Sequence, residues 1–475
     1  MAKLKFYLIA LFVITSTCHL FAQTWSTPER INPEGMQAPH PSLTTDSSGT
    51  VWCSWCAQDG NAYVSHYDGS WSDPDTIYGS GSIFFVGSCL STDANGNVWL
   101  VGGDDGVGKW SCFFDGNSWS DIVWIPVFPS CNHDGLATGD GLGNVWFAWT
   151  TGYFGDLHEV AYNVYSNGQW GSPMRVTYST EDDNTLLSVT TDRSGRVWLG
   201  WQGSHGTPDC TSINACFNDG SGWSDTMLID TCVGCSYVDG PALAVDTAGQ
   251  VWAGWCTGES SNNNIYASYY NGVVWSSPMH VGSEPGSAAW PYPAVTHDSL
   301  GGIWLTWMNP THDISFSYWN GTNWSNSAPV DTHPAMDGTP VMTFDGERVW
   351  VAWCSFRDGY PCVYASYTYG VGVEEKPAAE PLLSAPGLRQ NYPNPFSINT
   401  TISYQLPSDC HFSLKIYDIT GTLVGTLVNQ NQKAGRYLVN WNGKDNVGTQ
   451  LPAGIYFLRL ETSNKSITKK IVKLE

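Results

Sequence analysis

The sequence predicts an all-β fold, in which a seven-bladed β-propeller is followed by a small β-sandwich. Composition is the first observation: aromatic residues make up 14% of the 475 residues, charged residues 13%, and there are 50 glycines. Such a mixture favours strands and turns over helices. The second observation is a tryptophan-containing motif that recurs every 46 to 54 residues. The third is an alternation of apolar and polar residues near the C-terminus, typical of half-buried strands.

Residues 1–23 have the pattern of a secretory signal peptide. Lys3 and Lys5 give the positive start, an apolar run covers residues 6–15, and a small residue, Ala22, ends a plausible cleavage site. The apolar run is too short to span a bilayer, and no later stretch is long enough. We therefore expect an exported protein that is not an integral membrane protein.

The inner repeated motif is D-x-x-G-x-V-W-x-x-W. Its copies begin at Asp46, Asp93, Asp140, Asp192, Asp246 and Asp298, and a shortened seventh copy begins at Asp345. The aspartate can accept hydrogen bonds from the amides of a tight turn, and the glycine supplies a positive φ. Each copy therefore predicts a turn between the first two strands of a blade, with the tryptophans packed between blades.

An outer motif alternates with the inner one: an aromatic residue, Asn/Asp-Gly, and then Trp, usually followed by Ser. Its tryptophans are Trp71, Trp119, Trp170, Trp223, Trp275 and Trp324, and the last repeat has none. Trp25-Ser26, near the start of the mature chain, supplies a seventh copy without its partner strands. We expect this N-terminal strand to complete the last blade and close a ring of seven four-stranded blades.

The chain divides into regions of opposite charge. The predicted propeller, residues 24–372, holds 7 Lys and Arg against 35 Asp and Glu, a net charge of −28. This excess of carboxylates disfavours nucleic-acid binding, because it repels phosphates. Residues 373–387 are rich in Pro, Ala and Glu and read as a linker. Residues 373–475 together carry a net charge of +3, and residues 388–475 alternate as strands of a small β-sandwich do.

The C-terminal region also contains a series of motifs in a characteristic order. They are L-R-Q-N-Y-P-N-P-F from Leu388, T-I-S-Y-Q-L-P from Thr401, L-K-I-Y-D-I-T-G from Leu414, W-N-G-K-D from Trp441, L-P-A-G-I-Y-F-L-R-L from Leu451 and K-K-I-V-K-L from Lys469. Together they resemble the type A C-terminal sorting domain of the type IX secretion system, which is related to the FlgD Ig-like fold. The resemblance implies an Ig-like sandwich, the type IX machinery as a partner, and a secreted or surface-attached protein.

In the same resemblance, the terminal sorting signal would be Lys470, Ile471, Val472 and Lys473. A basic last strand has a simpler interpretation as well, because lysines on an edge strand prevent pairing with other chains.

Thirteen cysteines remain after removal of the signal peptide, so at least one is unpaired or bonds to another chain. Export permits disulfides. Cys210 and Cys216 flank a short loop, and we predict a disulfide between them. Cys232 and Cys235 lie in a loop and could close locally. No second Cys pair stands at zinc-ribbon spacing, so no metal site is expected.

The connections between blades, and those between the second and third strands, are longer and more varied than the turns. Function on a regular scaffold concentrates in such loops. Candidate ligand-binding residues near the central axis are His40, His133, Asp134, Asp239, Trp290, Tyr292, Asp337 and Arg357. Carboxylates and imidazoles support acid–base chemistry, and Trp290 with Tyr292 could stack on a sugar ring. Alternatively, the Asp and His residues are solvated turn residues and Trp290 packs over a neighbouring blade.

Among enzymes, the repeats most resemble a degenerate member of the sialidase-like superfamily. Residues 268–275 match the Ser, Gly and Trp of its Asp-box, but Tyr270 stands at the Asp position. The resemblance implies three arginines at a sialidase site, and only Arg357 lies on the loops in question. Sialidase chemistry is therefore disfavoured.

Other catalytic motifs are absent from the sequence: there is no G-x-S-x-G, H-E-x-x-H or phosphate-binding loop. No cofactor is expected, and no catalytic residue is assigned. The leading hypothesis is a protein that binds extracellular glycans or proteins. The alternatives are a glycan-active enzyme, either a glycoside hydrolase or a polysaccharide lyase, and a structural surface protein without a discrete ligand.

Overall fold

The computed structural model of the chain forms two compact units, Met1–Val373 and Glu374–Glu475. The residues that it describes are 25–79, 88–104, 108–128, 135–152, 158–178, 182–205, 210–233, 235, 237–259, 262–286, 291–369, 387–388, 391, 394, 396, 400–406, 410–433, 435–446, 448–462 and 465–474. Every regular element in these residues is a β-strand, and none is a helix. The predicted all-β fold is confirmed. The predicted signal peptide lies outside the described residues.

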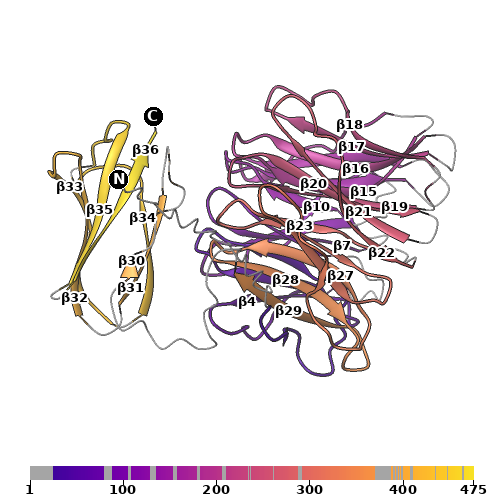
Figure 1. Ribbon diagram of the computed structural model, residues 1–475, viewed down its shortest axis with the longest axis horizontal. Helices are drawn as coiled ribbons and strands as arrows, with labels where there is room; N and C mark the ends of the chain where they lie inside the picture. Colours follow the sequence, from indigo (N-terminus) through magenta and orange to yellow (C-terminus); the bar gives the residue numbers. More distant parts are fainter. Residues whose placement is uncertain are drawn as a thin grey trace, which may run out of the picture. The chain divides into compact units, whose positions relative to one another are not determined.

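The first unit contains seven antiparallel sheets within its described residues (Figure 1). The first three are β2(Ser42–Thr45)–β3(Val51–Cys56)–β4(Asn61–Tyr67)–β5(Asp75–Gly79), then β6(Cys89–Thr92)–β7(Val98–Asp104)–β8(Gly108–Phe114)–β9(Val123–Ile125), then β10(Leu136–Gly139)–β11(Val145–Thr151)–β12(Glu159–Ser166)–β13(Gln169–Trp170), with β14(Met174–Arg175) also paired to β12. The fourth is β15(Asp182–Thr191)–β16(Val197–His205)–β17(Cys210–Asn218)–β18(Met227–Val233).

The last three sheets continue the same order of strands. They are β19(Tyr237–Val245)–β20(Val251–Glu259)–β21(Asn262–Tyr270)–β22(Met279–Pro285), then β23(Ala294–His297)–β24(Ile303–Met308)–β25(Ile314–Trp319)–β26(Ala328–Pro329), and finally β27(Asp337–Phe344)–β28(Arg348–Ser355)–β29(Cys362–Tyr369)–β1(Glu29–Arg30). The last sheet thus joins the first strand of the chain to three strands that lie more than 300 residues later.

The seven sheets close into a ring. The first strand of each sheet contacts the first strand of the next, in the series β2, β6, β10, β15, β19, β23, β27 and back to β2. Between every two sheets, the outer tryptophan of one packs edge-on against the first motif tryptophan of the sheet before it. These seven pairs have ring centroids 5.8 to 6.4 Å apart and interplanar angles of 81 to 89°. Edge-to-face geometry is a favoured arrangement for aromatic pairs. The repeated tryptophans therefore supply the contacts that hold neighbouring sheets together in a propeller-like ring.

Trp25 provides one of the seven pairs, with Trp304, although it precedes all the other repeats in sequence. Ser26 exchanges backbone and side-chain hydrogen bonds with Ser366 and Tyr367 of β29. In the first sheet, Ser72 makes the same set of bonds to Ser65 and His66. The N-terminal strand therefore completes the last sheet, as the sequence predicts.

Each D-x-x-G aspartate organises its turn. Asp46 Oδ1 accepts from the amides of Ser48 and Thr50, at 2.8 and 3.0 Å. Its Oδ2 accepts from Trp52 Nε1 at 2.8 Å. The same aspartate–indole bond recurs in all seven copies, at 2.8 to 3.0 Å. One aspartate side chain in each motif therefore accepts hydrogen bonds both from the turn amides and from the motif tryptophan. The geometry of the turn alone does not predict the bond to the indole.

The second sheet departs from the motif, because Gly102 replaces the later tryptophan. A Cβ atom at Gly102 would lie 2.8 Å from Trp110 Cε2, so the indole of Trp110 occupies this space. Trp110 lies on the neighbouring strand β8 and is 3% exposed. A tryptophan from the third strand therefore replaces the missing one of the second strand.

The second unit has two sheets whose inner faces share one core. The first is β30(Gly387–Leu388)–β31(Thr400–Leu406)–β34(Gly435–Trp441), and the second is β33(Leu423–Gln432)–β32(Cys410–Tyr417)–β35(Gly454–Thr462)–β36(Ser466–Lys473). Ile402 and Trp441 of the first sheet belong to one apolar cluster with Leu458 and Ile471 of the second. This arrangement is a small β-sandwich.

The predicted sorting signal forms the second half of β36, which is an edge strand of its sheet. Ile471 is fully buried and Lys470 is exposed. Asn394 binds the strand from outside the sheet: its Oδ1 accepts from the Val472 amide at 2.7 Å, and its Nδ2 donates to the Lys470 carbonyl at 3.1 Å. The first and last motifs of the C-terminal region therefore meet in space.

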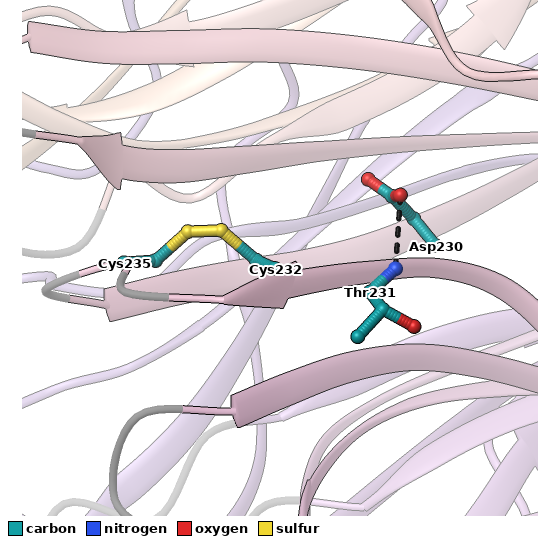
Figure 2. Close-up of a disulfide and its surroundings, with 4 residues drawn as sticks. All are labelled: Asp230, Thr231, Cys232 and Cys235. Carbon is teal, nitrogen blue, oxygen red and sulfur yellow. Dashed lines mark hydrogen bonds between the residues drawn. A yellow bond between two sulfur atoms is a disulfide. The ribbon is translucent and has the colours of Figure 1, made fainter.

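The predicted disulfide between Cys210 and Cys216 is wrong. Both residues belong to the single strand β17, and Cys216 is buried with a free thiol. Six residues of extended strand separate the two Cα atoms by roughly 20 Å, whereas a disulfide needs less than about 7 Å. The disulfide lies instead between Cys232 and Cys235, whose Cα atoms are 5.9 Å apart (Figure 2). This local pairing of Cys232 and Cys235 is a possibility that the sequence already indicates.

Candidate functional site

The two ends of the ring differ in their chemistry. We call the end with the seven D-x-x-G turns the turn face, and the end where β2, β6, β10, β15, β19, β23 and β27 begin the loop face. Of the eight residues predicted for the loop face, His40, Asp239, Tyr292, Asp337 and Arg357 are described, all at or near the start of inner strands or just after β28. His133, Asp134 and Trp290 lie outside the described residues.

Asp239 and Tyr292 lie in contact across two neighbouring sheets. The backbone amide of Tyr292 donates to Asp239 Oδ2 at 2.7 Å. Asp239 is 3% exposed, whereas the side chain of Tyr292 is 36% exposed. Burial raises the pKa of Asp239 to about 6, against the opposing effect of the Tyr292 and Gly240 amides. Asp239 therefore fixes the backbone from which an exposed aromatic ring projects.

Four inner strands have the same unusual backbone geometry, either just before the strand begins or at a register shift within it. A residue with positive φ stands directly before proline in His40-Pro41 (φ 52°), Gly240-Pro241 (113°), Tyr292-Pro293 (47°) and Thr339-Pro340 (48°). Proline disfavours this region for the preceding residue, and side chains with a Cβ rarely adopt it. Surrounding contacts must therefore hold the loop face in these conformations, as Asp239 does for Tyr292.

Asp337 and Arg357 lie in contact within the last sheet. Arg357 Nη2 is 3.5 Å from Asp337 Oδ2 and 2.6 Å from Asp331 Oδ2, and its Nε donates to Ser355 Oγ at 2.9 Å. Burial raises the pKa of Asp337 to about 6, although Ser355 and Arg357 act to lower it. Asp337 Oδ1 has no hydrogen-bond partner. Trp353 is close enough to lower this pKa, but its indole does not reach hydrogen-bonding geometry.

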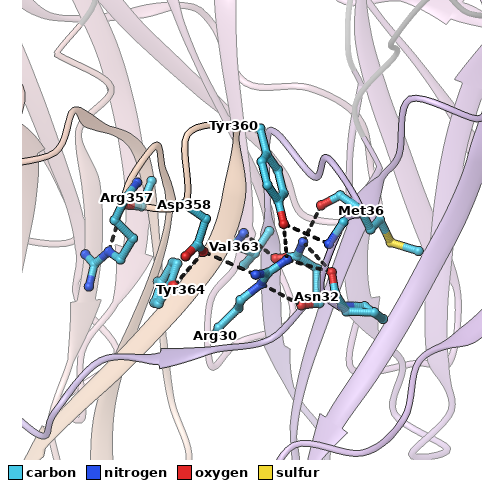
Figure 3. Close-up of polar contacts among 11 residues, drawn as sticks. Arg30, Asn32, Met36, Arg357, Asp358, Tyr360, Val363 and Tyr364 are labelled. Atoms are coloured by element: carbon cyan, nitrogen blue, oxygen red, sulfur yellow. Dashed lines mark hydrogen bonds and ion pairs between the residues drawn. The ribbon is translucent and has the colours of Figure 1, made fainter.

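A second polar network lies beside the first and holds the N-terminal segment (Figure 3). Arg30 pairs with Asp358 at 3.3 Å and donates to Tyr360 Oη at 3.2 Å. Tyr364 Oη donates to the same Asp358 carboxylate at 2.7 Å, and burial together with this bond raises the pKa of Tyr364 to about 12. The Arg357 guanidinium stacks 4.1 Å above the Tyr364 ring. This network joins the closing strand to the residues around Arg357.

Contacts through the sixth sheet connect the Asp239 and Asp337 groups. The Met308 amide donates to the Pro291 carbonyl at 2.7 Å, next to Tyr292. On the other side, a Cβ atom at Gly338 would lie 3.3 Å from Met308 Sδ. The Asp337 amide donates to the His312 carbonyl at 2.7 Å. Four of the predicted residues therefore form one continuous patch over three sheets, and His40 makes no described contact with it.

Buried polar atoms without a partner occur toward both ends of the ring. On the turn face, all seven first-motif tryptophans donate to their aspartates. Toward the turn face, the indole nitrogens of five outer-motif tryptophans lack a partner: Trp25, Trp71, Trp223, Trp275 and Trp324. Toward the loop face, polar atoms lack a partner in Lys109, Trp149, Gln202, Trp255, Trp307, Asp337, Thr339 and Trp353. The indoles recur at equivalent positions of the repeat, so their lack of a partner follows from the packing of the ring. Asp337 Oδ1 and Lys109 Nζ have no such equivalents, and buried polar groups in native proteins are nearly always bonded, so these two atoms are able to bond with a ligand or water.

Sequence reasoning missed Asp331, Ser355 and Lys109. Asp331 follows the fourth strand of its sheet, and only the fold brings it to Arg357. Ser355 carries no distinctive sequence signal. Lys109 did have one, because it is the only lysine among residues 24–372.

A groove of about 750 Å³ lies elsewhere, between the outer strands of the fifth and sixth sheets. Residues 279–283 of β22 line one side, and Trp319 and Trp324 lie on the other. Both indoles pack on Trp252, with centroids 6.1 and 6.3 Å away, so their position follows from the packing of the ring. We assign no function to this groove.

Within the described ranges, no cluster of three His, Cys, Asp or Glu side chains could hold a metal ion. In the same ranges, no helix has the length and apolar character needed to cross a membrane.

A family model for the FlgD Ig-like domain matches residues 397–466. This match confirms the Ig-like sandwich that the C-terminal motifs imply. Among curated proteins, none matches the chain in sequence.

Several solved structures are similar to this chain. A polysaccharide lyase of family PL25, an ulvan lyase, has a TM-score of 0.52 at 12% identity, covering 72% of this chain and 95% of its own. A fungal alcohol oxidase of the AA5 family, in complex with copper, has a TM-score of 0.49 at 13% identity, covering 95% and 99%. PorZ, a surface component of the type IX secretion system of Porphyromonas gingivalis, has a TM-score of 0.43 at 15% identity, covering 93% and 61%.

At such low identity, the likeness to the lyase shows a propeller-like fold and nothing about activity. The two weaker likenesses carry no conclusion about this chain.

Proposed function

We propose that this chain is an exported, surface-associated protein that binds extracellular glycans at the loop face of a seven-bladed β-propeller. The observation that carries the proposal is the continuous patch that Asp239, Tyr292, Asp337 and Arg357 form over three sheets, in which Tyr292 is exposed and Asp337 Oδ1 has no hydrogen-bond partner. Glycan sites combine aromatic faces with hydroxyl, amide and carboxyl groups. The loop face offers the ring of Tyr292 beside the buried carboxyl groups of Asp239 and Asp337.

The test is a glycan-binding screen with the purified protein, followed by titration of the best ligand. Tyr292→Ala should weaken binding by about tenfold, because a stacked aromatic ring contributes on the order of 1–2 kcal/mol. The matched control is Val273→Ala, at a turn-face residue that is 79% exposed. Equal affinities for Tyr292→Ala and wild type would exclude this face as the site. Absence of binding to every glycan would exclude the proposed function.

A glycan-active enzyme is the second candidate, favoured by one observation. Asp239 and Asp337 both have pKa values raised to about 6, close to the pH at which an acid or base works efficiently. The experiment is incubation of the protein with soluble polysaccharides, monitoring reducing ends for hydrolysis and the unsaturated product for lyase cleavage. Product release that Asp337→Asn abolishes, while binding persists, would establish the enzyme.

We also propose that residues 1–23 and 388–475 direct export through the type IX secretion system. Support comes from the FlgD Ig-like match and from the way Asn394 and Phe396 bind the last strand. The test is expression in a bacterium that has this system, with and without residues 388–475. Retention of the truncated protein inside the outer membrane is expected. Equal release of both forms would refute the proposed role of the tail.

A further inference from the structure

Lys109 is an isolated positive charge inside a strongly acidic unit. It is the only lysine among residues 24–372, which hold 35 Asp and Glu. Its residue is 2% exposed, and its Nζ has no hydrogen-bond partner. No described carboxylate forms an ion pair with it either. Burying an ammonium group without a partner is costly, and selection normally pairs or removes it.

The repeats show what this position otherwise contains. Lys109 of β8 lies opposite Gly103 of β7 in the strand register, near the loop-face ends of both strands. Gly103 directly follows Gly102, which stands at the position of the later motif tryptophan. The residues at the register of Lys109 in the other six sheets are Ala62, Val160, Ile213, Ile265, Ile314 and Val363. All six are aliphatic and at most 2% exposed. The fold therefore requires an apolar side chain here, and a lysine is not needed for packing.

The neighbouring strand is adapted to the lysine. Gly103 stands where the other sheets have Cys56, Thr150, Gln202, Cys256, Met308 and Cys354. A Cβ atom at Gly103 would lie 2.6 Å from Lys109 Nζ, so any side chain there would displace the ammonium group. Lys109 and Gly103 are thus two adjacent departures from the repeat: the lysine supplies a charge, and the glycine leaves the space that the lysine side chain occupies. Together they indicate a specific role for Lys109.

Four of the six arginines of this unit are engaged in ion pairs. Arg196 and Arg348 pair with the turn aspartates Asp192 and Asp345 at 2.7 Å. Arg30 pairs with Asp358, and Arg357 pairs with Asp331 and Asp337. Lys109 is thus a cation on the loop-face side whose bonding capacity is unused within the described residues.

We infer that Lys109 recognises an oxyanion of the bound glycan, so that the ligand of the loop face is an acidic saccharide. This inference rests on the proposed glycan-binding function and specifies its ligand class. The oxyanion is a uronate carboxylate or a sulfate ester, because both accept hydrogen bonds from an ammonium group. The net charge of residues 24–372 repels polyanions at long range, so recognition depends on this local, desolvated contact.

The experiment titrates three probes into the full chain: oligogalacturonate for carboxylate, sulfated dextran oligosaccharides for sulfate, and maltohexaose as the neutral saccharide. Wild type should bind one acidic probe more tightly than the neutral one. Lys109→Met, which keeps the length but not the charge, should weaken that binding by about tenfold to a hundredfold. The control Arg193→Met removes the same charge from an exposed residue on the turn face and should change little.

Unfolding measurements accompany the titration. Lys109→Met should fold and be at least as stable as wild type, because the other repeats have aliphatic residues there. A large loss of stability would reveal a structural partner and overturn the inference. Tight binding of maltohexaose alone, or unchanged acidic-probe binding in Lys109→Met, would overturn it as well, yet leave the glycan-binding function standing. Failure of wild type to bind any saccharide would instead refute the proposed function.

Discussion

The backbone amide of Tyr292 donates to the buried carboxylate of Asp239 at 2.7 Å, and so joins two neighbouring sheets at the loop face. Tyr292 has a φ of 47° and stands directly before a proline. This hydrogen bond thus holds an otherwise disfavoured backbone at Tyr292, a residue that is 36% exposed. Asp239 acts as a positioning residue for the Tyr292 ring.

The first prediction concerns that bond. Asp239→Ala should lower the free energy of unfolding by about 1–3 kcal/mol, because it leaves the Tyr292 amide without its acceptor. Asp239→Asn keeps an acceptor oxygen and should retain the loop. Chemical denaturation of the two variants checks this. Equal stabilities would mean that the loop does not depend on the hydrogen bond.

The second prediction is a pH dependence. The pKa of Asp239 is raised to about 6 from an ordinary value of 3.8, so the fold favours its protonated form. The protonated carboxyl group of Asp239 therefore contributes to the free energy of unfolding. This contribution is fully present below pH 3.8 and is lost as pH rises through 6. Asp239→Asn mimics the protonated form. Its unfolding free energy should match wild type at pH 4 and exceed it by about 1–3 kcal/mol at pH 8.

Denaturation curves for both proteins at pH 4, 6 and 8 measure this difference. A gap that is constant over the whole range would show that the Asp239 carboxyl does not titrate there.

The third prediction concerns the turn aspartates. Asp298 is 1% exposed and accepts from the Leu300 and Gly302 amides and from Trp304 Nε1. Asp298→Ala removes all three acceptors and should cost about 2–4 kcal/mol, measured by urea denaturation. Leu300→Ala, in the same turn at 65% exposure, should cost less than about 0.5 kcal/mol. Similar losses for the two variants would contradict the role given to the motif.

The fourth prediction tests ring closure. Trp25 packs edge-on against Trp304 and lies 5.3 Å from the Phe316 ring. Trp25→Ala should destabilise the first unit by about 2–4 kcal/mol, because truncation of a packed tryptophan removes a large apolar contact. The melting of the first unit, followed by tryptophan fluorescence, reports the loss. A melting temperature within one degree of wild type would show that the ring does not need this strand.

Periodic features could be predicted from the sequence, and features built by contacts between distant loops could not. The spacing of Trp52 and its six counterparts indicated the repeated sheets, and Trp25-Ser26 indicated how the last sheet is completed. The disulfide was mispredicted because proximity in sequence was taken for proximity in space, whereas Cys210 and Cys216 lie along one strand. For the candidate site, Asp239, Tyr292, Asp337 and Arg357 were each predicted separately. Their pairings, and the role of Asp331, depend on loops that carry no periodic signal.

The most direct test of the account is hydrogen–deuterium exchange of the full chain with and without the tightest glycan found by screening. The account predicts that the ligand slows amide exchange on the loop face, in residues 237–242, 291–294, 337–341 and 355–360. Exchange at the turn face, around the D-x-x-G turns that begin at Asp46, Asp246 and Asp298, should be unchanged. Protection confined to the turn face, or to the groove lined by Trp319 and Trp324, would contradict the placement of the site.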